Sequence, residues 1–298
     1  MRKRHFLHAA AAAALTTLTA VAPTLATAGP AAALTLDVYN PGADAMFPVT
    51  SVLVLGRKQA ILVDAQFGRS QAAQLVAKLQ ASGRTLSAIF ISHGDPDYYF
   101  GLDTVLAAFP GVKVLATPQT VAHIEATRAA KLACWGPKLG ADAPAATVVP
   151  QVLAGNRLTL EGQTIEVRGL NGPQPERSYL WIPSLKAVLG GVVLSNNQHV
   201  WMADTQSPQS HADWLATLQD IAALKPRQVV PGHMLPGAST ALQSVAFTAG
   251  YIRAFDEETP RAADSAALIA AMKQRYPQAG ELPSLALSAK VAKGEMRW

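Results

Sequence analysis

The chain has 298 residues, half of them hydrophobic, and its 25 lysine and arginine residues outnumber 20 aspartate and glutamate residues. Three of the basic residues lie within the first 28 positions, so the rest of the chain carries 22 positive and 20 negative charges. This nearly neutral, apolar composition predicts a sizeable core, and it gives no reason to expect nucleic acid or an anionic membrane as a partner.

The start of the chain has the pattern of a secretory signal peptide. Basic residues at 2–4 precede an apolar stretch at 6–25, and the small residues at 26–28 form an A-x-A cleavage site. Pro23 interrupts the apolar stretch and argues against a stable membrane span, although an uncleaved N-terminal anchor is the alternative. We therefore expect export to the periplasm or out of the cell, with one mature domain at 29–298.

The first half of the mature chain alternates predicted strands and helices. Short apolar runs between turn residues predict strands at 33–40, 51–56, 60–66, 87–92 and 112–118. Apolar residues at helical spacing predict one helix from Ser70 to a stop at Gly83 and another over 120–132. The run at 87–92 is apolar without interruption, as expected for a strand buried on both faces.

The second half begins with a segment, 134–156, that is rich in Gly, Pro and Ala and has no clear period. It predicts a long connection that could border a pocket. A β-rich block at 157–194 follows, and then a helix that begins at Ser210, whose spacing to Asp213 resembles a capping box. The remaining predictions are a strand at 227–234 and helices at 238–256 and 264–275.

Several single residues have a structural interpretation. Cys134 is the only cysteine, so it cannot form an intramolecular disulfide, and no motif surrounds it; we expect a buried, inert thiol. His123 and His211 lie in predicted helices and are expected to be structural or on the surface. Four aromatic residues could line a pocket but are expected in the core: Tyr98, Tyr99, Phe100 and Trp201.

The stretch "ISHGDPDYYFG" places His93, Asp95 and Asp97 just after the buried strand at 87–92. Catalytic and ligand-binding groups of α/β proteins favour this end of a strand. Each residue also has a simpler explanation, because Asp95 precedes a proline in a common turn and Asp97 could cap a helix. A second histidine, His233, follows the late strand in "VVPGHM".

Two β-rich blocks, each followed by helices and each with a histidine-bearing loop, predict a two-sheet sandwich. The element order, the pattern Ser-His-x-x-x-Asp-x-x-x-Gly at 92–101 and the later "VVPGHM" resemble the metallo-β-lactamase-fold hydrolases over residues 33–260. The resemblance implies an α/β fold, namely a four-layer αβ/βα sandwich, with a metal site between the halves.

The ligand loop of that family reads His-x-His-x-Asp-His. His93 and Asp97 match it, Asp95 stands where a histidine is usual, and Tyr98 replaces another histidine with a weak ligand. The family's final histidine is matched by His233. The resemblance therefore implies metal ligation by these three matching residues together with Asp95.

Two further family ligands are missing from the sequence. Pro173 stands at the position of a histidine and Gly191 at the position of the bridging aspartate. His199 and Asp204 follow in a loop that could turn toward the site and supply replacements. Alternatively, His199 packs or faces water, and Asp204 forms an Asx turn with Gln206.

Four ligands, His93, Asp95, Asp97 and His233, are too few for a binuclear centre but could hold one divalent ion. Imidazole and carboxylate ligands favour zinc, with manganese or iron as alternatives. Asp97 could act on the metal-bound water and Tyr98 on an oxyanion. We therefore expect a metal-dependent hydrolase of a small-molecule substrate, which would be an ester, lactone or amide, β-lactams included. The alternative is a non-catalytic binding protein whose metal site has decayed.

Overall fold

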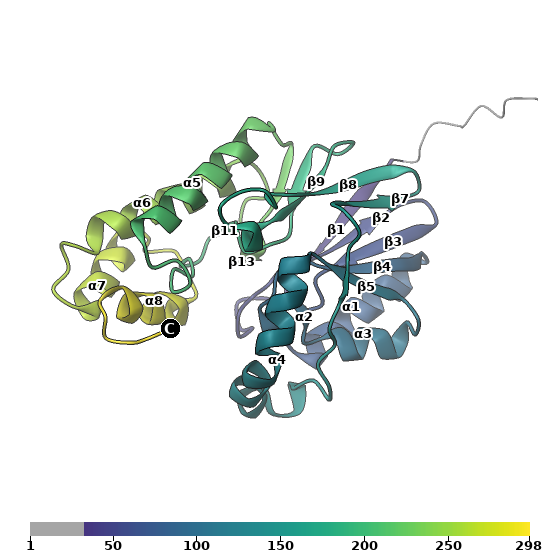
Figure 1. The fold of residues 1–298 in the computed structure, drawn as a ribbon, viewed down its shortest axis with the longest axis horizontal. Coiled ribbons are helices and arrows are strands. Elements are labelled where there is room, and N and C mark those ends of the chain that lie inside the picture. The colour runs from purple at the N-terminus through teal and green to yellow at the C-terminus, as the bar shows by residue number, and fades with distance from the viewer. Residues whose placement is uncertain (1–32) are drawn as a thin grey trace, which may run out of the picture. The chain divides into compact units, whose positions relative to one another are not determined.

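The computed structural model describes residues 33–298, which belong to one compact unit (Figure 1). The predicted signal peptide lies outside the described residues. Within 33–298, the structure contains no helix of the length and apolarity needed to cross a membrane.

Six strands form the first sheet, in the order in which they occur in the chain. They are β1 (Thr35–Tyr39), β2 (Ser51–Leu55), β3 (Gln59–Val63), β4 (Thr85–Ile91), β5 (Lys113–Ala116) and β6 (Gln151–Val152). Strands β1 to β3 are antiparallel, and β3 to β6 are parallel. Parallel neighbours need a crossover, which helix α1 (Arg69–Ser82) provides between β3 and β4. The five strands predicted for this half are confirmed.

Helices cover the outer face of this sheet. Besides α1 they are α2 (Pro96–Tyr99), α3 (Leu102–Ala108) and α4 (Pro118–Leu139), followed by the 3₁₀ turn η1 (Gly140–Asp142). A core cluster joins Leu62 and Ile89 of the sheet to Leu75 and Ile124 of the helices. The predicted stop at Gly83 is confirmed, because this residue adopts the left-handed conformation that ends α1.

Five strands form the second sheet, in the order β12-β10-β9-β8-β7. Their bounds are β7 (Arg157–Leu160), β8 (Gln163–Arg168), β9 (Tyr179–Ile182), β10 (Ala187–Leu189) and β12 (Gln228–Val230), with the 3₁₀ turn η2 (Pro175–Arg177) before β9. Two short strands, β11 (Ser195–Asn196) and β13 (His233–Met234), pair with each other in parallel. The helices of this half are α5 (Pro208–Ala223), α6 (Gln243–Glu258), α7 (Ser265–Arg275) and α8 (Leu282–Ala292).

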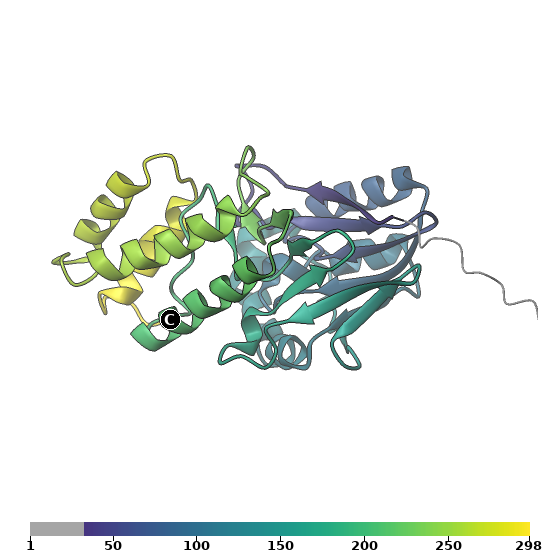
Figure 2. The same ribbon diagram turned by 90° about the horizontal axis from the view of Figure 1, so that it is seen from above.

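The two sheets face each other across a shared core. Val54 and Phe90 of the first sheet belong to the same buried cluster as Ile165 and Leu180 of the second. Another cluster joins the second sheet to the helices α5 to α8, which are green to yellow in Figure 1. In Figure 2 the teal strands of the second sheet lie alongside the purple and blue strands of the first. The predicted four-layer αβ/βα sandwich is confirmed.

Several boundaries differ from the sequence prediction. Helix α4 continues through Pro137 to Leu139. The first six residues of the predicted 134–156 connection are therefore helical. Helix α5 begins at Pro208 with Ser207 as its cap, because the Ser207 hydroxyl accepts from the Ser210 amide at 3.1 Å. The prediction that Ser210 begins this helix was therefore wrong. Helix α8 was not predicted.

Candidate functional site

The candidate site forms where loops from the two halves meet. His93 and Asp95 follow the carboxyl end of β4, and Asp97 lies in the single turn α2. The pairing of β13 with β11 places His233 beside Ser195, and an isolated bridge joins His233 to Val49 of the first half. The fold thus places all four residues predicted as metal ligands in this region, in two separate pairs.

These four residues lie in two histidine–aspartate pairs. His93 Nε2 is 3.2 Å from Asp95 Oδ2, and His233 Nε2 is 3.2 Å from Asp97 Oδ2. The ring of Tyr98 lies between the two imidazoles, with centroids 5.2 Å from His93 and 5.5 Å from His233. The tyrosine therefore separates the pairs instead of bridging them.

Tyr98 itself is fully buried, and its hydroxyl donates to the carbonyl oxygen of Gly191 at 3.4 Å. Burial, with the charges of Asp97 and Asp64, raises the pKa of Tyr98 well above its usual value, so the phenol stays protonated. A catalytic role for Tyr98 stays a prediction, and its position favours packing between the two pairs. Tyr99 and Phe100 are buried in the core, as expected.

Two residues of α4 join the first pair. Lys131 Nζ donates to Asp95 Oδ1 at 2.6 Å and to the Gly94 carbonyl oxygen at 3.2 Å. His123 Nε2 accepts from the same ammonium at 2.8 Å and lies 3.8 Å from Asp95 Oδ1. His123 is exposed, in agreement with the expectation that it is structural or on the surface, but it also contacts the candidate site through Lys131 and Asp95. His123 and Lys131 are about two helical turns apart and so share one face of the helix, which was the signal in the sequence that they could act together.

The charges of this cluster favour the ionised carboxylate of Asp95 and the protonated imidazole of His93. Burial works to raise the pKa of Asp95, but His93, His123 and Lys131 outweigh burial and hold it well below its usual range. Burial likewise works to lower the pKa of His93, and the charge and hydrogen bond of Asp95 outweigh it, so the net shift is upward. His93 Nδ1 is 3.2 Å from the Glu176 carbonyl oxygen, which fixes the ring from its other side.

A buried chain behind the site was missed by sequence reasoning. Asp64, at the end of β3, accepts from the Ser92 amide at 2.8 Å and from the Ser92 hydroxyl at 2.6 Å. The Gly191 amide donates to the same hydroxyl at 2.7 Å, so the chain links the loop before His93 to the second sheet. Burial raises the pKa of Asp64 to about 7, although both bonds from Ser92 work to lower it. The position of Asp64 near the end of the predicted strand at 60–66 was the signal in the sequence that could have identified it.

The pairs open on a pocket of about 530 Å³. Asp95, Asp97, Lys131 and His233 line one part of it. Its other walls are mostly apolar and aromatic, and include Phe47, Trp135, Trp201, Trp214, Leu287 and Trp298. A concave apolar space with a few convergent polar groups is the usual form of a small-molecule site.

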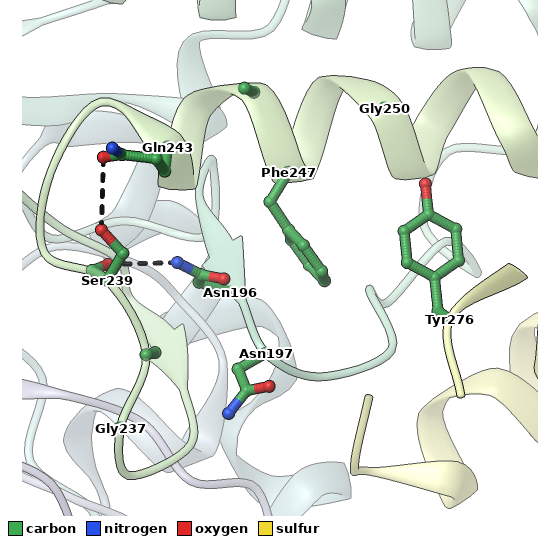
Figure 3. Close-up of a pocket in the computed structure, with 10 residues that line it drawn as sticks. Asn196, Asn197, Gly237, Ser239, Gln243, Phe247, Gly250 and Tyr276 are labelled. Atoms are coloured by element: carbon green, nitrogen blue, oxygen red, sulfur yellow. Dashed lines mark hydrogen bonds between the residues drawn. The ribbon is translucent and has the colours of Figure 1, made fainter. Parts of the chain in front are cut away.

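A second hollow lies between β11 and α6, and hydrogen bonds join some of its lining residues (Figure 3). Asn196 donates to the Ser239 carbonyl oxygen at 3.1 Å, and the Ser239 hydroxyl donates to Gln243 at 3.4 Å. This hollow is open and contains none of the titratable pairs described above. The pocket beside His233 is therefore the candidate site.

The two residues proposed as replacement ligands have other partners. His199 Nδ1 is 3.0 Å from the Tyr251 hydroxyl in the core of the second half, and burial lowers the pKa of His199 to about 4. Asp204 accepts from the indole N–H groups of Trp201, at 2.9 Å, and Trp298, at 2.5 Å. These indole bonds replace the Asx turn expected for Asp204, and ligation by either residue stays a prediction.

Cys134 corrects another expectation. Its side chain is exposed and lines the pocket, because α4 continues past the predicted end and turns this face toward the site. Trp201 also lines the pocket instead of the core. His211 is buried and pairs with Asp256 at 2.5 Å, in agreement with a structural role.

A family model of the metallo-beta-lactamase superfamily matches residues 45–233. The chain therefore belongs to this superfamily, and membership supports a hydrolase. Similar solved structures include a metallo-beta-lactamase from Pontibacter korlensis, with a TM-score of 0.56 and 18% identity over 74% of this chain and 99% of that one. The metallo-beta-lactamases DIM-1 (TM-score 0.54, 16% identity, 75% and 98% covered) and IND-7 (0.54, 16%, 73% and 93%) are also similar. These identities show the fold alone. No curated protein matches the sequence.

Superfamily members typically bind divalent metals, usually zinc. A zinc site needs at least three protein ligands around one point. Among residues 33–298, no group of three or more His, Cys, Asp or Glu side chains is placed to hold a metal ion. Each histidine–aspartate pair provides two donors, and Lys131 already contacts Asp95. The donor set as arranged does not fit the metal centre that the family implies.

Proposed function

We propose that the protein is an exported hydrolase of a small ester, lactone or amide with an apolar body, and that it acts in the pocket beside His233. The observation that carries this proposal is the Asp97–His233 pair, held at 3.2 Å on the wall of an apolar pocket. Superfamily membership supports the reaction class. The predicted single zinc ion is not part of the proposed step, because the four predicted ligands lie in two separate pairs.

The chemistry follows from that pair. Asp97 orients the imidazole of His233, as a carboxylate beside a histidine generally does. His233 accepts a proton from water as the water oxygen attacks the substrate carbonyl carbon. The proton then passes to the leaving oxygen or nitrogen as its bond to carbon breaks. The positive charge of Lys131 in the same pocket favours the anion that develops on the carbonyl oxygen.

The test is hydrolysis by the purified mature chain of a panel of chromogenic esters, lactones, amides and β-lactams. His233→Gln and Asp97→Asn should each lower kcat/KM by about 10²–10⁴-fold, the usual contribution of general base catalysis. His211→Gln is the matched control, since His211 also pairs with an aspartate but does not line the pocket. Turnover that is unchanged in both pocket variants would overturn the proposal.

Binding without turnover is the second candidate function. The lack of metal ligands favours this binding function. Pro173 and Gly191 stand where family members have metal ligands, so each histidine–aspartate pair has no third ligand. A binding protein would bind panel compounds, measured by calorimetry, and leave them intact over the time in which an enzyme turns over. That result would exclude the hydrolase proposal for those compounds.

A further inference from the structure

We propose that Lys131 takes the place of a metal ion at Asp95, so that this pocket contains a resident ammonium group instead of a divalent cation. The inference concerns the same pocket as the proposed hydrolysis, but it rests on contacts and not on turnover. It also predicts that the metal affinity of the site can be restored by removing one side chain.

The ammonium of Lys131 donates hydrogen bonds to three acceptors, and these acceptors are of the kinds found in cation sites. Its acceptors are the Gly94 carbonyl oxygen at 3.2 Å, Asp95 Oδ1 at 2.6 Å and His123 Nε2 at 2.8 Å. A carbonyl, a carboxylate and an imidazole are all groups that can also coordinate a metal ion. The side chain of Lys131 is 20% exposed, so it lies largely inside the protein.

The main chain is adapted to this arrangement. A Cβ atom added at Gly94 would lie 2.6 Å from the ring of His123, so glycine at this position lets the imidazole approach the loop. Lys131 and His123 belong to one helix, α4, which holds both over the Asp95 loop. Both side chains of the contact are therefore supplied by one regular element.

The same ammonium prevents metal binding by the groups around it. His93 Nε2 and His123 Nε2 lie 3.2 Å and 3.8 Å from the two oxygens of Asp95, so two imidazoles flank this carboxylate. A zinc ion bound by them would lie next to the Lys131 charge, and like charges repel strongly in a partly buried site. His93, Asp95 and His123 are residue types that bind zinc but do not converge on one point as placed; removal of Lys131 would free the Asp95 carboxylate, so that small side-chain movements can bring the three together as a zinc site.

The Asp97–His233 pair lacks a third metal ligand for a different reason. Gly191, at the position of the family's bridging aspartate, has φ of 73°, and a Cβ atom there would clash with the Ser178 carbonyl oxygen. No side chain can project from this position without a shift of the backbone. Asp97 and His233 thus remain a two-donor pair, and the new zinc site is expected only at Asp95.

The experiment measures zinc content by plasma mass spectrometry and zinc affinity by calorimetry, on the full processed chain after dialysis against zinc. We expect the parent protein to retain no stoichiometric zinc and Lys131→Met to gain one equivalent, with a rise in Tm on zinc addition. Lys131→Gln is a second, polar variant in case the methionine variant does not fold. The double variant Lys131→Met/His123→Ala should lose the gain.

Lys138→Met is the matched control, because Lys138 lies on the same helix and pocket but contacts the Trp135 ring, at 4.1 Å, and no carboxylate. It should retain no zinc. The inference is overturned if the parent holds one zinc equivalent that depends on His93 and His233, or if both folded Lys131 variants gain none. Since no readout is turnover, failure of the proposed hydrolysis leaves this result unaffected, and the hydrolysis is tested separately by the turnover of the His233 and Asp97 variants.

Discussion

Single positions decide whether the family's metal chemistry can exist in this chain, and Gly191 is the clearest of them. Its amide donates to Ser92, its carbonyl accepts from Tyr98, and its φ of 73° suits glycine. The loss of the aspartate at this position is therefore built into the backbone. A sequence comparison finds the missing side chain, but only the structure reveals that the position has no room for one.

Gly191→Ala should destabilise the protein for two reasons. The left-handed backbone costs a residue with a Cβ atom about 1–2 kcal/mol, and the clash with Ser178 should cost a further 1–3 kcal/mol, as other overpacked positions do. Gly83→Ala is the control, because Gly83 has φ of 66° but nothing within 4 Å of an added Cβ atom. Urea denaturation measures both variants. Equal losses in the free energy of unfolding would contradict the predicted clash.

Helix α4 is the element that separates what the sequence could predict from what it could not. Its first turns follow from Thr117, whose hydroxyl caps the helix, and from apolar residues at helical spacing. The sequence prediction ended it at residue 132, because the helical period fades there into a stretch rich in Gly, Pro and Ala. The helix continues because Trp135 packs edge-on against Phe47, with ring centroids 5.0 Å apart, and tertiary packing outweighs local propensity.

This extension creates much of the candidate site. It places Cys134, Trp135 and Lys138 on the pocket wall, after Lys131 in the preceding turn. Sequence reasoning proposed residues that lie in the candidate site, because family spacing and strand ends point to them: His93, Asp95, Asp97 and His233. It missed Lys131 and His123, since the contact of a helix with a distant loop depends on tertiary packing that local patterns do not contain.

Trp135→Ala should therefore loosen the end of α4. The side chain is half-buried between Phe47 and Phe67, so its loss should destabilise the protein by about 1–3 kcal/mol, less than a fully buried tryptophan would. Hydrogen exchange of the backbone amides at 133–139 should become faster by at least about tenfold. Glu125→Ala, an exposed substitution in the same helix, should leave exchange unchanged. Unchanged exchange in the tryptophan variant would show that local propensity holds this turn.

At the scale of the whole molecule, the layered fold was the easiest feature to predict. Alternating strand and helix patterns fixed most elements of the first half, and the two sheets bury the residues expected from them. The C-terminal part was harder, since α8 carries no cap signal that the sequence analysis used, and its first residue follows Glu281 in a left-handed conformation. The match to the superfamily ends at residue 233, yet the pocket depends on the chain beyond it.

Leu287 of α8 and Trp298 line the pocket and lie in this C-terminal part, beyond the family match. Residues outside the match should therefore help to determine which ligand the pocket binds. Leu287→Ala should weaken binding of the apolar probe 8-anilino-1-naphthalenesulfonate about 3–10-fold, since it removes roughly 1 kcal/mol of apolar contact. Leu282→Ala is the matched control, because Leu282 belongs to the same helix but is 46% exposed and does not line the pocket. Fluorescence titration of the folded variants measures both affinities. An equal effect of the two leucines would mean that the probe binds elsewhere and that α8 does not form a wall of the binding site.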